Sequence, residues 1–263
     1  MNKNYDPRHP IILGLAGKAA TGKTSVAESI VPKASFAASR QGMLWEHIFF
    51  AMPLYEFYSA RTKIEGLNAE SRKLFSIHQT LYELYGSSPL GSVPPYEDFV
   101  ELTKQISSKP IDDYGYKPRS YLQEVGDMCR SYDPSCFAKW GIGKANKLFN
   151  EYMRSLDEEE EELPYCVIIS DVRFKNEADV ILSSPNGILI VYDADPSIRQ
   201  ERILNRDGVM MTNEQISHRS EKEIELFLDQ ASAIIDSSSM SIEEQAIETI
   251  KIVRERLSVD TYA

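Results

Sequence analysis

The residues whose types and spacing could most clearly do chemistry lie near the N-terminus, at positions 17–24. This segment reads Gly-Lys-Ala-Ala-Thr-Gly-Lys-Thr and fits the pattern G-x-x-x-x-G-K-[ST] at every fixed position. Glycines let the backbone curl so that successive N–H groups face one point, and a helix that follows adds the partial positive charge of its N-terminus. The pattern therefore predicts a loop that binds a polyphosphate.

The side chains of this loop predict a bound nucleotide and a metal ion. Lys23 would reach the β- and γ-phosphates, and the Thr24 hydroxyl would take one coordination position on Mg²⁺. We therefore expect ATP and Mg²⁺ as cofactors. The residues expected to contact the nucleotide are Gly17, Lys18, Ala19, Ala20, Thr21, Gly22, Lys23, Thr24 and Ser25.

A second polar group follows the apolar run at 166–169. Asp171 comes closely after that run, and Arg173 and Glu177 follow it. Because the carboxyl ends of parallel strands meet at the ligand-binding edge of a sheet, Asp171 is predicted to lie beside the phosphate loop and to share the metal with Thr24. The alternative is that these are strand-end charges that simply meet solvent.

Three arginines recur at helical spacing in the segment 196–207. Arg199, Arg202 and Arg206 would share one face of a helix, where three guanidinium groups repel one another unless an anion lies between them. We expect this face to capture phosphate during transfer, with Lys23, Asp171, Arg202 and Arg206 as the catalytic set. The alternative is a surface helix with arginines paired to neighbouring carboxylates.

A third candidate site is a predicted helix over residues 119–130. Offsets of four, seven and eleven place Arg119, Gln123, Gly126 and Arg130 on one narrow face, opposite an apolar stripe. Two guanidinium groups, an amide and a glycine suit a flat polar ligand. The alternative is a solvated helix face that tolerates its glycine.

The elements that must position these residues follow from short apolar runs that alternate with helical patterns. The expected fold class is α/β, with a parallel sheet flanked by helices and a mostly helical insertion at about 62–117 over the acceptor site. We expect residues 1–263 to form a single domain. Strands are expected at 11–16, 44–51, 166–171, 188–192 and 233–235, with a connection at 34–42.

Composition narrows the class of function. The 263 residues are 42% hydrophobic, enough for a full core, and 29 Lys and Arg against 40 Asp and Glu give a net charge of −11. That balance disfavours nucleic acid as a partner. No run approaches the roughly 18 apolar residues of a membrane span, so we expect a cytoplasmic protein without membrane contact. A monomer and a homodimer both stay open. The acidic run at 157–162 is expected to be a solvated loop, with metal binding as the weaker alternative.

Three segments resemble the bacteriophage-type deoxynucleoside monophosphate kinases, a family of P-loop nucleotide kinases. Residues 170–178, Ser-Asp-Val-Arg-Phe-Lys-Asn-Glu-Ala, are similar to its D-V-R-F-x-N-E-A signature. Residues 119–126 with Arg130 resemble its R-x-x-L-Q-x-x-G block, and residues 218–221 resemble its H-x-S-E. The chain departs at Asp127, where the family usually has Thr, and residues 62–116 match nothing in the family.

The resemblance implies ATP-dependent phosphorylation of deoxynucleoside 5′-monophosphates to diphosphates, in the host cytoplasm if the protein is of phage origin. It implies that Arg119, Gln123, Arg130, Asp171, Arg173 and Glu177 bind the acceptor nucleotide. A dephosphocoenzyme A kinase is an alternative, because residues 199–208 and 233–241 are similar to that enzyme. A P-loop GTPase or regulatory ATPase is an alternative of another class. The chain has no Asn-Lys-x-Asp, and Val-Arg-Phe follows Asp171, which argues against a GTPase.

Overall fold

The computed structural model describes residues 5–31, 38–40, 42–55, 126–127, 129–131, 133–157, 162–212, 216 and 219–257, with backbone alone at 38–40 and 220. The chain divides into two compact units. One consists of Met1–Phe50 and Gly141–Ala263, and the other consists of Ala51–Trp140. The predicted phosphate loop belongs to the first unit, which contains the sheet.

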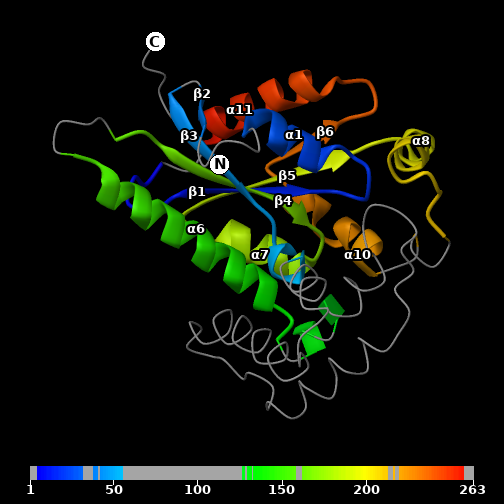
Figure 1. Ribbon diagram of the computed structural model, residues 1–263, viewed down its shortest axis with the longest axis horizontal. Coiled ribbons are helices and arrows are strands. Elements are labelled where there is room, and N and C mark those ends of the chain that lie inside the picture. Colours follow the sequence, from blue (N-terminus) through cyan, green and yellow to red (C-terminus); the bar gives the residue numbers. More distant parts are fainter. Residues whose placement is uncertain are drawn as a thin grey trace, which may run out of the picture. The chain divides into compact units, whose positions relative to one another are not determined.

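A six-stranded sheet is the frame of the first unit, with the strand order β2-β3-β4-β1-β5-β6 (Figure 1). Five strands run parallel, and β2 pairs antiparallel with β3 at the edge. The strands are β1 Ile11–Ala16, β2 Ala38–Arg40, β3 Met43–Ile48, β4 Tyr165–Val172, β5 Asn186–Asp193 and β6 Ala233–Asp236. The fold is thus α/β, a mostly parallel sheet flanked by helices, as the sequence predicts.

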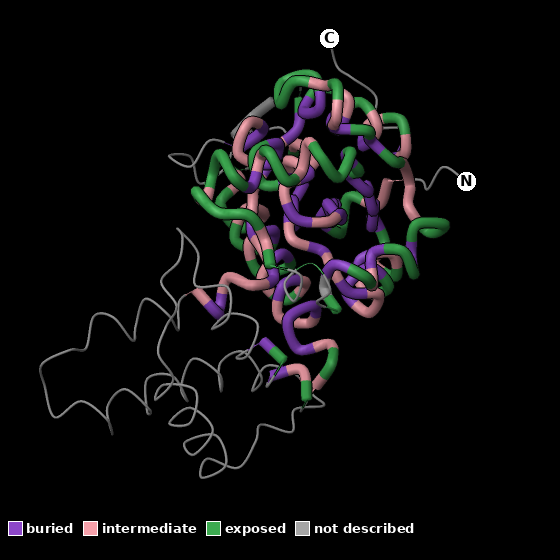
Figure 2. Tube along the Cα trace, turned by 90° about the vertical axis from the view of Figure 1, so that its right-hand side faces the viewer, coloured by how far each residue is buried: buried purple, intermediate pink, exposed green. Residues whose placement is uncertain are grey.

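Strand β1 is central because every one of its six residues is buried. It pairs in parallel with β4 on one side and with β5 on the other. Side chains alternate between the two faces of a strand, and Ile11, Leu13 and Leu15 join the core cluster that includes the helices α1 and α11. On the opposite face Gly14 leaves room for Ile181, whose Cδ1 lies 2.6 Å from the position that a Cβ would take. Figure 2 shows buried positions concentrated at the middle of this unit, with exposed positions around it.

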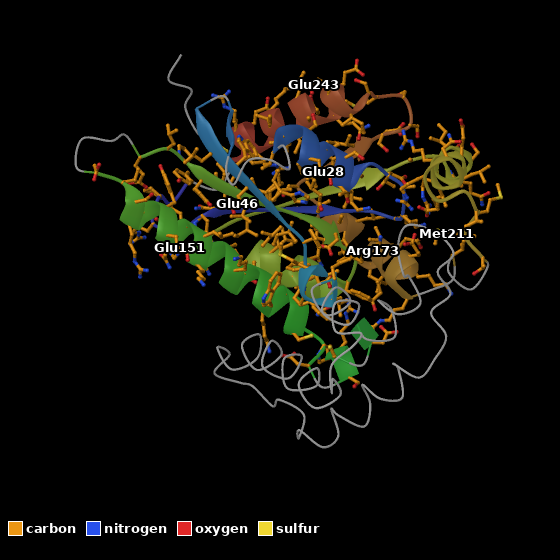
Figure 3. The ribbon with its side chains drawn as sticks, viewed as in Figure 1. Glu28, Glu46, Glu151, Arg173, Met211 and Glu243 are labelled. Atoms are coloured by element: carbon orange, nitrogen blue, oxygen red, sulfur yellow. The ribbon has the colours of Figure 1, made fainter. Side chains whose placement is uncertain are left out.

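Helices cover both faces of the sheet (Figure 1). Helices α1 Lys23–Ile30 and α11 Ile242–Leu257 lie on one face, while α6 Cys136–Ser155 and α7 Lys175–Ser183 lie on the other. Glu28 and Glu243 mark the first pair of helices in Figure 3, and Glu151 marks α6 on the opposite side. The remaining elements are α8 Pro196–Asp207, α10 Arg219–Lys222 and the 3₁₀ helix η1 Glu223–Gln230.

The helix ends follow from local sequence. The Asp195 carboxylate accepts a hydrogen bond from Ser197 N at 2.8 Å and caps α8, and Gly208 ends that helix with a φ of 73° in the left-handed region. At the start of α11, Ser241 N donates to the Glu244 carboxylate at 2.7 Å and Glu244 N donates to Ser241 Oγ at 3.2 Å. Capping depends only on residues close in sequence, so each of these three ends is explained by its own neighbours.

Two expectations about this unit were wrong. The segment 34–42 is not all connection, because residues 38–40 form β2 and pair with β3 across Gly42, whose φ of 71° suits a tight hairpin turn. The pattern Ser241-x-x-Glu244 predicts a helix whose buried stripe begins with Ile242. Ile242 is instead 37% exposed, because it stands at the first position of the helix, at the end of that stripe. The other expected members of that stripe, Ala246, Ile250, Val253 and Leu257, are buried.

In the second unit, residues 52–55, 126–127 and 129–131 are helical. The helical insertion predicted at 62–117 lies outside the described residues, as does most of the helix predicted at 119–130. Among the described residues of both units, no helix is both long and apolar enough to cross a membrane.

Gly17 generates a stability prediction. Its φ of 143° is one that other residues rarely adopt, and a Cβ there would lie 2.3 Å from the carbonyl oxygen of Tyr192 in β5. Gly17→Ala should therefore destabilise the protein by about 2–4 kcal/mol, from backbone strain and overpacking together. Thermal unfolding measures the effect.

Gly143 provides the matched control. It is exposed within α6, and a Cβ there would meet no atom within 4 Å. Gly143→Ala should stabilise the protein by about 0.5–1 kcal/mol, because alanine loses less backbone entropy than glycine on folding. A Gly17→Ala protein that melts at the wild-type temperature would contradict the tight contact between the loop and β5.

Candidate functional site

The predicted phosphate loop connects β1 directly to α1 at the carboxyl edge of the sheet. Three of its residues have positive φ, namely Gly17 at 143°, Ala20 at 61° and Gly22 at 93°. Helix α1 begins at Lys23, and Val26 N donates to Gly22 O at 2.9 Å in the first turn. The order of strand, loop and helix that the motif predicted is therefore confirmed.

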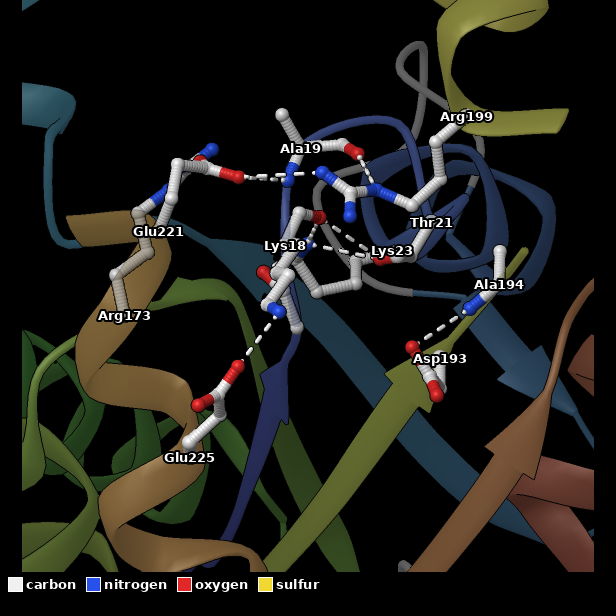
Figure 4. A network of polar contacts seen from close by, with 11 residues as sticks. Lys18, Ala19, Thr21, Lys23, Arg173, Asp193, Ala194, Arg199, Glu221 and Glu225 are labelled. Atoms are coloured by element: carbon white, nitrogen blue, oxygen red, sulfur yellow. Dashed lines mark hydrogen bonds and ion pairs between the residues drawn. The ribbon is translucent and has the colours of Figure 1, made fainter. Parts of the chain in front are cut away.

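Lys23 lies inside the loop. It is 5% exposed, and its ammonium donates to Gly17 O at 2.7 Å, Lys18 O at 2.8 Å and Thr21 Oγ1 at 3.0 Å (Figure 4). Burial lowers the pKa of the Lys23 ammonium well below its ordinary value, and the positive charge of Arg173 lowers this pKa further. Burial and a neighbouring positive charge both disfavour the charged form of Lys23, and a nearby anion would favour it. A polyphosphate is such an anion.

Two arginines of α8 hold the next part of the loop. Arg199 Nε donates to Ala19 O at 2.9 Å, and Arg202 Nη1 donates to Ala20 O at 3.3 Å. Arg202 also donates through Nη2 to Ser237 O at 2.7 Å, beyond the end of β6. Together with Lys23, these arginines place a cationic donor on each of four successive carbonyl oxygens, those of residues 17–20.

A carboxylate absent from the predicted site lies at its centre. Glu221 of α10 is 5% exposed, and its Oε2 accepts from the backbone N–H of Ala19 at 2.9 Å. Its Oε1 accepts from Arg173 Nη1 at 2.5 Å, and Arg199 Nη2 lies 3.5 Å from its Oε2 (Figure 4). The signal that could have found it is the H-x-S-E segment, of which Glu221 is the last residue.

A second contact joins the same region of the chain to the loop. Lys18 Nζ lies 2.8 Å from Glu225 Oε1, on η1 (Figure 4). This pair is more exposed than the Glu221 cluster, with 32% of the Lys18 side chain and 65% of the Glu225 side chain accessible. The hydrogen bond from Lys18 lowers the pKa of the Glu225 carboxyl. An exposed pair of this kind contributes little to stability.

Asp171 lies where the sequence predicted, at the carboxyl end of β4. Its Oδ1 accepts from the backbone N–H of Phe50 at 2.6 Å, which ties the end of β4 to the segment after β3. Its negative charge raises the pKa of Lys23, so the two charges act on each other. This supports the predicted position of Asp171 near the loop, and its part in catalysis stays a prediction.

The predicted metal ligands are an exposed hydroxyl, Thr24 at the start of α1, and the half-buried carboxylate of Asp171. Both supply the hard oxygen donors that Mg²⁺ prefers, so the donor set fits that ion when phosphate oxygens complete its shell. Within the described parts of the chain, no group of three or more His, Cys, Asp or Glu side chains could hold a metal by itself. A metal here would therefore depend on the nucleotide.

Glu177, predicted to bind substrate, has two described contacts with backbone. Its Oε2 accepts from Arg173 N at 2.9 Å and from Phe174 N at 3.1 Å, and the residue is 2% exposed. These bonds cap the start of α7 and fix the backbone from which the Arg173 side chain extends. Figure 3 shows Arg173 beyond the end of the sheet.

Arg206 differs from the other two arginines of α8. Its Nε lies 2.6 Å from Asp207 Oδ1 and its Nη2 lies 2.7 Å from Asp207 Oδ2. This is the pairing with a neighbouring carboxylate that the sequence left as an alternative. Arg199 and Arg202 contact the loop, and the catalytic role expected for Arg206 stays a prediction.

The predicted acceptor helix lies in the second unit, and Arg119 and Gln123 fall outside the described residues. Arg130 is described: its guanidinium carbon lies 4.9 Å from the centre of the Phe137 ring, and its Nη1 lies 3.7 Å from Asp127 Oδ1. A Cβ on Gly126 would lie 2.8 Å from Arg130 Nη1. The space beside this glycine is therefore taken by the Arg130 guanidinium.

Comparison with protein-family models and with curated proteins finds no match for this chain. Solved structures that resemble it include TT1252 from Thermus thermophilus, with a TM-score of 0.45, 15% identity, and coverage of 95% of this chain and 98% of that one. They also include a gluconokinase from Sinorhizobium meliloti 1021, with a TM-score of 0.37, 14% identity and 95% coverage of both chains. Likenesses of this strength do not decide an activity.

Glu177 generates a prediction that separates capping from ligand binding. Glu177→Ala should lower the free energy of unfolding by about 1–3 kcal/mol, because two backbone N–H groups at a buried position lose their acceptor. Glu177→Gln keeps one carbonyl oxygen and should lose less. Urea denaturation measures both.

Asp179→Ala is the control, because Asp179 pairs with Lys175 at 2.7 Å on the exposed side of the same helix. That variant should unfold close to the wild-type midpoint. If Glu177→Ala and Asp179→Ala were equally stable, the capping role of Glu177 would be excluded.

Proposed function

We propose that this protein is an ATP-dependent kinase that phosphorylates deoxynucleoside 5′-monophosphates to diphosphates. The observation that carries the proposal is that Lys23, Arg199 and Arg202 all donate to one glycine-containing loop at the carboxyl edge of a parallel sheet, and that Arg173 is joined to the same loop through Glu221. Phosphoryl transfer needs positioned cations more than covalent chemistry, and this arrangement supplies them.

The donor nucleotide is assigned to the loop. Its backbone N–H groups and the start of α1 receive the phosphates, and the Lys23 ammonium neutralises charge on the β- and γ-phosphates. Mg²⁺ held by Thr24 and Asp171 would neutralise further charge on those phosphates when bound. The burial of Lys23 limits water around its ammonium, which strengthens its interaction with an anion.

The residues assigned to the acceptor are those that the sequence predicts. An oxygen of the acceptor phosphate attacks the γ-phosphorus of ATP, the bond from that phosphorus to the bridging oxygen breaks, and ADP leaves with the electron pair. Arg173 would hold the acceptor phosphate, while Arg119, Gln123 and Arg130 would hold the nucleoside. Support for a deoxynucleoside acceptor comes from the resemblance of residues 119–126, 170–178 and 218–221 to phage-type kinases.

A coupled assay of ADP release tests the activity. With ATP and Mg²⁺, we expect release that depends on at least one of the four deoxynucleoside monophosphates. Lys23→Met should reduce it by about 10²-fold or more, because the ammonium that neutralises phosphate charge is lost. Methionine keeps most of the side-chain volume, and circular dichroism verifies that the variant folds.

The other outcomes of the same assay separate the alternatives. Release only with dephosphocoenzyme A would identify the dephosphocoenzyme A kinase activity instead. Release that no acceptor increases would identify an ATPase. Either result would overturn the proposed acceptor.

The arginines of α8 give a second prediction. Arg202→Ala should lower kcat by about tenfold or more, because Arg202 holds Ala20 O of the loop and Ser237 O together. Arg206→Ala should lower kcat much less, because the described pairing of Arg206 is with Asp207. Steady-state kinetics of both variants measure the difference, and equal losses would support the catalytic role that the sequence predicts for Arg206.

A further inference from the structure

The Glu221 carboxylate receives the kind of donors that a phosphate group receives. It accepts from one backbone N–H of the loop, Ala19 N at 2.9 Å, and lies against two guanidinium groups, those of Arg173 at 2.5 Å and Arg199 at 3.5 Å. Backbone N–H groups and arginines are the standard ligands of protein-bound phosphate. We infer that Ala19 N, Arg173 and Arg199 form a phosphate subsite, and that Glu221 occupies it when no phosphate is bound.

Burial supports this assignment. Only 6% of the Glu221 side chain is exposed, against 65% of the nearby Glu225. A carboxylate is costly to bury unless donors replace its water, and here two cations and a loop N–H replace it. The donors come from three separate places in the chain, namely the loop after β1, the segment after β4 and helix α8. They therefore form a preassembled anion site and not a local turn.

The charges around the loop also support a phosphate subsite. Arg173 and Arg199 both lower the pKa of Lys23, and Glu221 raises it, so these four groups act on one another. Without Glu221 the same space would hold three cations. An incoming phosphate carries the same sign of charge as Glu221 and would use the same donors, so the carboxylate and the phosphate compete.

Competition between the Glu221 carboxylate and a phosphate has a measurable consequence. The inference rests on the proposed function in one respect, namely that the ligand is a phosphate. Glu221→Gln removes the negative charge and keeps the side-chain shape. Its dissociation constant for inorganic pyrophosphate should fall about tenfold or more relative to wild type, because a like charge close to the ligand is gone. Glu221→Asp, which keeps the charge, should not bind more tightly than wild type.

Isothermal titration calorimetry with pyrophosphate is the experiment, and thermal unfolding confirms that each variant is folded. Glu225→Gln is the matched control, since it removes the same charge from an exposed position near the loop, and it should change the dissociation constant by less than about twofold. Repeating the titration with a non-hydrolysable ATP analogue and with a deoxynucleoside monophosphate shows whether the subsite serves the donor or the acceptor, since only its own ligand should gain affinity.

The opposite result is equally clear. If folded Glu221→Gln binds pyrophosphate as wild type does, or more weakly, the inference is overturned, and weaker binding would make Glu221 a residue that positions the arginines. Lys23→Met separates this failure from failure of the proposed function. If wild type binds pyrophosphate and Lys23→Met does not, the loop remains the phosphate-binding site of the proposed function, even when Glu221 does not compete. Absence of binding in wild type and in Glu221→Gln would overturn both.

Discussion

Cationic side chains hold four successive carbonyl oxygens of the loop, and the rest of the site depends on these contacts. Lys23 binds the first two, those of Gly17 and Lys18, and Arg199 and Arg202 bind those of the next two residues. Charge-assisted hydrogen bonds of this kind are stronger than neutral ones. They fix the backbone of the loop and, in the same step, gather positive charge around it.

The protein as a whole is acidic, with a net charge of −11, yet the carboxyl edge of its sheet concentrates cations. The acidic net charge and the local cluster of cations are compatible. The electric field at the site is set by nearby groups, because distant charges are screened by salt. The cost of gathering buried cations is offset by Glu221, by Asp171 and by backbone carbonyls. Such an arrangement places counter-charges where a small anionic ligand could use them.

Local sequence was sufficient for features whose causes lie within a few residues. The turn around Gly17 and Gly22, the cap of α8 at Asp195 and the capping box of α11 at Ser241 all depend on short-range backbone chemistry. Buried strands were found because their apolar runs are continuous. Strand β2 was missed because it has three residues and exists through its pairing with β3.

The sequence by itself determined that a loop with the spacing of a phosphate-binding motif joins a buried strand to a helix, and that an acid and an arginine follow another such strand. Only the tertiary structure decided which charges meet. Glu221 reaches Ala19 across 202 positions of sequence, Arg199 reaches it across 180, and Arg206, on the same helix face as Arg199 by spacing, pairs with Asp207. Periodicity tells which side chains share a face, and the contacts of that face are set by the packing of the elements around it.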